Sequence, residues 1–122
     1  MSQEQIQEKI KEIKEELERM EGINISELRE MFDDVIDLTI NNPDFSVFML
    51  RKENFVIIYC TDRYYCKNYA LVFNNKEKAE ALVEIAEKLS EELFDQFAFS
   101  ANEFVTFIKN TMLDDVKVEE LE

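Results

Sequence analysis

Both cysteines of the chain lie within one stretch, NFVIIYCTDRYYCKNYALVFN, which covers residues 54–74. Cys60 and Cys66 flank a turn between two runs rich in β-branched and aromatic residues, a pattern typical of a β-hairpin. A loop with an odd number of residues places the two cysteines opposite each other, whereas a two-residue loop pairs Cys60 with Tyr65. The odd register is favoured because it gathers large side chains on one face: Phe55, Ile57, Tyr59, Tyr69, Leu71 and Phe73.

Three kinds of chemistry are open to these cysteines: a redox-sensitive disulfide, a metal site, or none. A typical zinc site needs further cysteine or histidine ligands, and the chain has two cysteines and no histidine. Thiols in the cytosol are usually reduced. We therefore favour two small core thiols at Cys60 and Cys66, with a cross-strand thiol pair as the alternative.

Tyrosines and basic residues cluster around the turn of the same hairpin. Arg63, Tyr64 and Tyr65 at its tip are of the types that dominate protein-binding surfaces, so they are candidate partner-binding residues. In the purely structural interpretation, some of these tyrosines fill the core and others cover the turn. Stacking on a single-stranded base is a third hypothesis, which the acidic flanking segments disfavour.

The rest of the composition argues against catalysis. The absence of histidine removes the usual general base, and a single glycine leaves no Gly-rich loop to hold phosphate. Asp33, Asp34 and Asp37 have a spacing that suits a weak magnesium site, but it suits a solvated helix face equally well. We predict no enzyme activity, no cofactor and no metal.

The net charge of −14 is distributed unevenly. Residues 1–44 and residues 76–122 each hold 13 acidic and 5 basic residues, whereas residues 45–75 hold 2 acidic and 4 basic ones. Most of the surface should therefore repel nucleic acid and anionic lipid. The sequence has no membrane-spanning stretch and its N-terminus lacks the apolar region of a signal peptide, so we expect a cytoplasmic protein.

The N-terminal segment has the periodicity of an amphipathic helix over residues 2–21, followed by Gly22 as a helix cap. Its apolar residues follow a narrow heptad-like spacing that is too short for a free-standing coiled coil. Residues 1–23 are therefore a candidate oligomerisation element that needs a partner surface. The predicted contact residues are Ile6, Ile10, Ile13, Leu17 and Met20.

The remaining pattern predicts a second helix, a three-stranded sheet and two further helices. The second helix is expected over residues 26–40, the strands over 45–51, 55–61 and 65–73, the third helix over 76–97, and a short fourth helix after Ser100. An acidic tail over 114–122 is expected to fray or to form a short edge element. Both faces of the predicted sheet are apolar. Either helices cover both faces, or one face contacts another chain.

These observations predict one α+β domain over residues 1–122, with two N-terminal helices, a three-stranded antiparallel meander and two C-terminal helices. The expected function is that of a small acidic, non-catalytic protein-interaction module, adaptor-like or chaperone-like and homodimeric. The alternative is an acidic inhibitor or nucleic-acid mimic that occupies the cationic groove of a nucleic-acid-handling protein.

Overall fold

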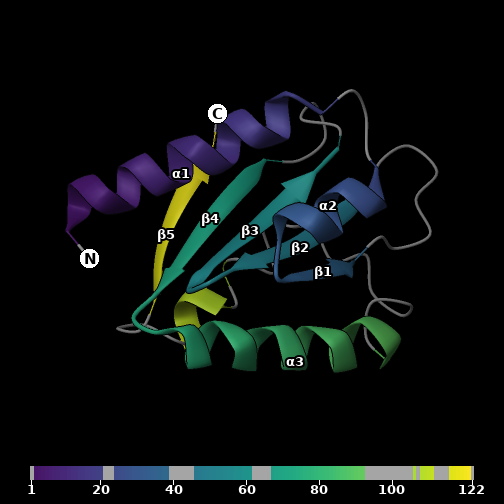
Figure 1. The fold of residues 1–122 in the computed structure, drawn as a ribbon. Helices are drawn as coiled ribbons and strands as arrows, with labels where there is room; N and C mark the ends of the chain where they lie inside the picture. Colours follow the sequence, from purple (N-terminus) through teal and green to yellow (C-terminus); the bar gives the residue numbers. More distant parts are fainter. Residues whose placement is uncertain are drawn as a thin grey trace.

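The chain forms an antiparallel β-sheet with helices on both faces (Figure 1). A computed structural model describes residues 2–20, 24–38, 46–61, 67–92, 106, 108–111 and 116–121, with residues 89–92 described by their backbone only. The elements are α1 (Gln3–Glu18), α2 (Ile25–Met31), β1 (Asp34–Asp37), β2 (Val47–Lys52), β3 (Phe55–Cys60), β4 (Asn68–Phe73), α3 (Lys76–Glu92) and β5 (Val116–Leu121). Thr106 and residues 108–111 are also helical. The five described strands lie side by side in chain order.

Helices cover both faces of the sheet, which was one of the two arrangements expected from its apolar faces. Helices α1 and α2 pack on one face and α3 packs on the other (Figure 1). The alternation predicted for β3 is confirmed, since Phe55 and Ile57 face α1 and α2 while Val56 and Ile58 face α3. The sheet therefore separates two apolar cores, and its central strands are buried on both sides.

The N-terminal helix forms as its sequence predicts. Ser2 caps it in a capping box with Gln5, and the apolar stripe at Ile6, Ile10, Ile13 and Leu17 lies against the sheet. The third predicted helix also forms, from Lys76 to Glu92, with Ala79, Leu82, Val83 and Ala86 in the core. The first helix ends at Glu18 with Arg19 as its C-cap, so the end predicted at residue 21 with a Gly22 cap is wrong. The part of the third predicted helix beyond Glu92 lies outside the described residues.

The predicted fold class is wrong in its strand count and in its two ends. The helix expected over residues 26–40 stops at Met31, Phe32 is extended, and residues 34–37 form β1 beside β2. Val35 and Ile36 are β-branched residues that fit a strand, and their spacing from Leu28 fits a helix equally well. Pairing with β2 decides between the two: the Asp33 N–H donates to the Arg51 carbonyl at 2.7 Å.

Residues 116–121 form β5 along the edge of β4, so the acidic tail forms the short edge element that was one of the two states expected for it. Val116 and Val118 pack toward α3, and Leu121 packs toward α1. An edge strand that is only partly covered can carry several charged residues, so its hydrophobic pattern is weak in the sequence. The last described element is therefore a strand, and the order of elements differs from the predicted two C-terminal helices.

The register expected for the hairpin of β3 and β4 is wrong by one residue. Ile57 pairs with Ala70 and Ile58 with Tyr69, whereas the favoured register paired Ile57 with Tyr69, and the alternative register does not match either. Tyr69 consequently packs in the α3-side core. Asn68, the buried first residue of β4, accepts a hydrogen bond from the Cys60 N–H at 2.7 Å, an interaction that the hydrophobic pattern cannot reveal.

Candidate functional site

The residues predicted to bind a partner fall into three groups. Ile6, Ile10, Ile13 and Leu17 are each at most 6% exposed, because α1 packs them against the sheet of its own chain. They are therefore not available as a contact surface in this fold. Met20 differs from them, since it is only partly buried and lines a groove described below.

The hairpin tip gives less information. Arg63, Tyr64, Tyr65 and Cys66 lie outside the described residues, so the predictions made for them are not tested. Cys60 is buried, as expected for a core residue, but it is disulfide-bonded rather than a free thiol.

Two of the aspartates considered for magnesium are ion-paired with a buried arginine. Arg51 on β2 donates to the Asp34 carboxylate directly opposite it, lies 3.6 Å from Asp33, and donates to the Glu53 carbonyl at 3.1 Å. Glu80 of α3 is 4.0 Å from the same guanidinium. Asp37, the third aspartate, also interacts with another group of the chain. Within the described ranges no group of acidic, cysteine or histidine side chains could hold a metal ion.

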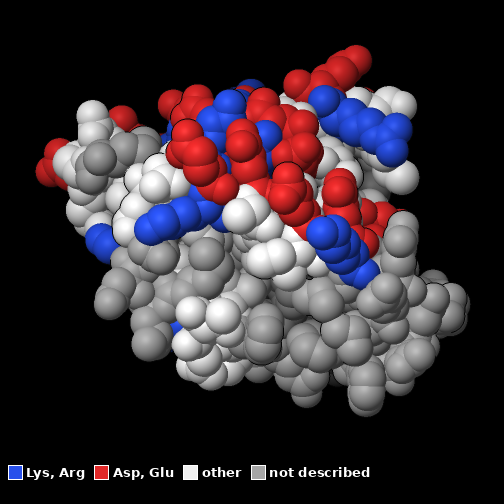
Figure 2. All heavy atoms as spheres, turned by 90° about the horizontal axis from the view of Figure 1, so that it is seen from below, with Lys and Arg blue, Asp and Glu red and all other residues white. Residues whose placement is uncertain are grey.

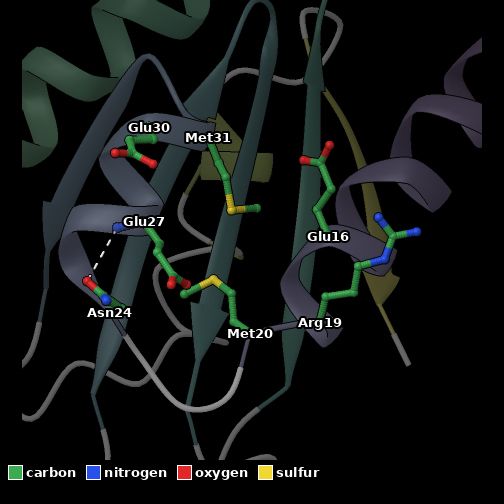
Figure 3. A pocket seen from close by; sticks show the side chains of 7 residues that line it. All are labelled: Glu16, Arg19, Met20, Asn24, Glu27, Glu30 and Met31. Atoms are coloured by element: carbon green, nitrogen blue, oxygen red, sulfur yellow. Dashed lines mark hydrogen bonds between the residues drawn. The ribbon is translucent and has the colours of Figure 1, made fainter.

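A groove lies between the end of α1 and α2. Its volume is about 750 Å³, and it is open to solvent. The lining residues, shown in Figure 3, are Glu16, Arg19, Met20, Asn24, Glu27, Glu30 and Met31. We call it the α1–α2 groove.

Local sequence explains how the two walls of the groove are placed. The stripe that ends at Leu17 fixes α1 on the sheet, so Glu16 and Met20 lie at the margin of that contact. On the other side, Asn24 caps α2 by accepting from the backbone N–H groups of Ser26 and Glu27 at 3.0 and 3.4 Å. Leu28 anchors α2 in the core with no exposed surface.

The groove combines apolar and acidic side chains. Met20 and Met31 extend into it from the end of α1 and from α2 (Figure 3), and both are partly buried against the core. Glu16, Glu27 and Glu30 surround them. Among the described residues none of these three carboxylates takes part in an ion pair, and neither does Arg19, the only basic residue of the lining.

The polarity of α1 adds to this negative charge. Its last turn contains acidic residues and no basic one, so Glu15, Glu16 and Glu18 lie beside the negative end of the helix dipole. Cations are the favoured neighbours of a helix C-terminus. Arg19, the C-cap residue of α1, supplies one cation against these three acidic residues, so a further positively charged neighbour would stabilise the end of α1.

Comparisons with known proteins supply no identification. No protein-family model, no curated protein and no solved structure matches this chain. In the described part of the chain no helix has the length and apolarity needed to cross a membrane. The functional argument therefore depends on the residues of the chain itself.

Sequence reasoning missed most of the α1–α2 groove. The sequence predicts Met20 as the last member of a helical seam, whereas Glu16, Glu27, Glu30 and Met31 are not among the predicted site residues. One signal was present in the sequence: the run EELERME places several acids and no lysine at the expected end of a helix. The position of α2 beside that end depends on tertiary packing.

Proposed function

We propose that this chain is a small acidic protein-interaction module without a catalytic role, and that the α1–α2 groove is its binding site. The observation that carries the proposal is the groove itself, where two partly exposed methionines lie among carboxylates that have no ion-pair partner within the described residues. Methionine side chains are flexible and polarisable, and they are common at surfaces that bind other proteins.

The distribution of buried surface supports this choice of site. Both faces of the sheet are already covered by α1, α2 and α3, and the α1 seam is used inside the chain. A homodimer formed through the Ile6 to Leu17 seam therefore has no exposed apolar stripe to use. The proposed module acts through the groove and does not require self-association.

The alternative of a nucleic-acid mimic has less support. The net charge of −14 favours it, and α1 and α3 each carry six acidic and three basic residues. On the side of the molecule formed by α3, however, lysines lie between the carboxylates (Figure 2). Lys76 is 3.5 Å from Glu80, for example. A mimic of phosphates needs a continuous negative surface, which this mixture does not offer.

Selection from a displayed library of random peptides, with the folded chain as bait, tests the proposal. The enriched peptides are remeasured against Met31→Trp, which fills the groove without changing its charge, and against Ile85→Trp on the opposite helical layer. Ile85 is 51% exposed and distant in the fold from α2, so it is a matched control.

We expect Met31→Trp to weaken the selected peptides by about tenfold or more and Ile85→Trp to leave them unchanged. Because Met31 is partly buried, Met20→Trp serves as a second groove variant, and circular dichroism verifies that each variant is folded. Equal binding to all folded variants would show that the groove is not the binding site.

A further inference from the structure

We infer that the ligand of the α1–α2 groove is a short cationic, amphipathic segment of a partner protein. Its lysine or arginine side chains lie against Glu16, Glu27 and Glu30, and one of its apolar side chains inserts between Met20 and Met31. This inference rests on the proposed function and adds the chemistry of the partner.

Charge complementarity is the first argument. Elsewhere in the described chain several carboxylates have basic partners: Asp33, Asp34 and Glu80 contact Arg51, Glu53 contacts Lys9, and Glu120 contacts Lys67. The carboxylates of the groove have none, and Arg19 is directed away from the methionines (Figure 3). The lining therefore holds three carboxylates and one guanidinium, and none of these four groups forms an ion pair within the described structure.

The ends of both helices increase this effect. Glu16 lies in the last turn of α1 and Glu30 in the last turn of α2, where the helix dipole is negative and favours cations. Arg19, the C-cap of α1, and Arg29, in the last turn of α2, already supply one cation at each helix end, and Glu16 and Glu30 stand beside them where further basic residues would be favoured. A residue that lowers helix stability is expected where it serves binding. A cation of the bound ligand then interacts favourably with the acidic residue and with the helix end.

The methionines define the second requirement on the ligand. A purely cationic segment would leave Met20 and Met31 exposed, whereas an aliphatic or aromatic side chain placed between them would bury apolar area on both. Helix α2 has seven residues and is therefore about 10 Å long. That length accommodates roughly two turns of a helical ligand, so the ligand is a short segment with few anchors.

Fluorescence anisotropy with four synthetic peptides tests the inference. The probe is a labelled lysine and leucine peptide of about 15 residues with helical periodicity. In the comparison peptides, glutamine replaces the lysines, glutamine replaces the leucines, or glutamate replaces the lysines. The groove variant is Glu16→Lys with Glu30→Lys, and the control of equal charge change is Glu8→Lys with Glu84→Lys, two exposed positions in α1 and α3.

We expect the lysine and leucine probe to bind most tightly, and to bind about tenfold or more weakly to the groove variant than to the control. Raising the salt concentration from about 0.05 to 0.5 M should weaken the complex, because it screens the ion pairs. The milder pair Glu16→Gln with Glu30→Gln should give an intermediate loss, which keeps the test valid if charge reversal disturbs folding.

Two contrary results are distinguishable. In the first, the peptide of glutamine and leucine binds as tightly as the probe, Met31→Trp abolishes binding, and Glu16→Lys with Glu30→Lys does not. The groove then binds protein segments, but the inference of a cationic ligand is refuted. The cationic ligand of the groove is also refuted if Glu8→Lys with Glu84→Lys loses as much affinity as the groove variant, since binding would then reflect the overall negative charge of the chain. If selected peptides and probe alike are insensitive to Met31→Trp and Met20→Trp, the proposed function itself fails.

Discussion

Arg51 and Glu30 show two different uses of charge in this chain. Arg51 is 6% exposed, and its guanidinium is surrounded by Asp33, Asp34 and Glu80, which it joins across β1, β2 and α3. The charge of Arg51 is neutralised within the chain, and its ion pairs hold together elements of the fold. Glu30 is exposed, has no ion-pair partner in the described chain, and lines the same groove as Met20 and Met31, so its charge is available to a ligand.

Replacing Arg51 by alanine is expected to destabilise the chain strongly. The variant removes the charge-assisted hydrogen bond to Asp34 and the bond to the Glu53 carbonyl and leaves three partly exposed carboxylates close together, so the expected loss is about 1.5–3 kcal/mol. Urea denaturation measures the loss. Lys52→Ala, on the next residue of β2, is the control and should change the free energy of unfolding by about 0.5 kcal/mol or less. A loss for Arg51→Ala as small as that of the control would show that the cluster is not structural.

At the scale of the elements, the end of α1 carries the clearest conflict between stability and charge. Its last turn has three acidic residues beside a single cation, the C-cap residue Arg19, and the apolar stripe on its other face is fully used in packing. The helix is therefore stabilised by burial of Ile6, Ile10, Ile13 and Leu17 and tolerates an unfavourable terminus. This is the pattern expected where a terminus contributes to binding.

Glu16→Lys should make the isolated chain more stable while weakening ligand binding. A lysine near the C-terminus of α1 interacts favourably with the helix dipole, which is worth about 0.3–1 kcal/mol. Thermal denaturation at low salt compares it with Glu8→Lys in the middle of the same helix, where the dipole contributes little. If Glu16→Lys lowers the melting temperature more than Glu8→Lys does, Glu16 has a structural role that the groove account omits.

Strand β5 should be protected from hydrogen exchange in the free chain. Its residues pair with β4 from Asn68↔Leu121 to Phe73↔Val116, so part of its amide groups are hydrogen-bonded within the sheet. Exchange measured by mass spectrometry on the peptide covering residues 116–121 should be slower than in the unfolded chain by several orders of magnitude. Exchange at the unfolded rate would instead support an acidic tail without a strand.

The sequence predicted the elements whose pattern is strong and local. The α1 stripe, the two faces of β3 and the core positions of α3 all follow from periodicity that a single element carries. The errors concern weak or nonlocal patterns: β1 was joined to α2 because Val35 and Ile36 fit either period, and β5 is charged. The hairpin register and the α1–α2 groove depend on contacts between distant residues, which one sequence does not display.

At the scale of the whole molecule, the layers formed by the described residues leave little apolar surface for self-association. The sheet is covered on both faces, and the two large apolar side chains that are exposed within the described chain, Ile25 and Ile85, lie on different helices. Isolated exposed residues of this kind are common on monomers. The acidic exterior further opposes contact between copies.

The chain should therefore sediment as a monomer of 14.5 kDa at micromolar concentration. Ile13 is 1% exposed, so Ile13→Asp should unfold the chain instead of separating subunits. Analytical ultracentrifugation measures the mass, and circular dichroism of the variant distinguishes unfolding from dissociation. A dimer that Ile13→Asp converts into a folded monomer would restore α1 as an oligomerisation element.

The central claim is that the α1–α2 groove binds protein segments, and the methyl signals of methionine test it most directly. The chain has five methionines; Met20 and Met31 line the groove, whereas Met49 is fully buried on the α3 side of the sheet. Titration with the lysine and leucine peptide, followed by NMR of ¹³C-methyl-labelled methionine, should shift the signals of Met20 and Met31 and leave Met49 unchanged. Saturable binding that leaves Met20 and Met31 unshifted would contradict the account.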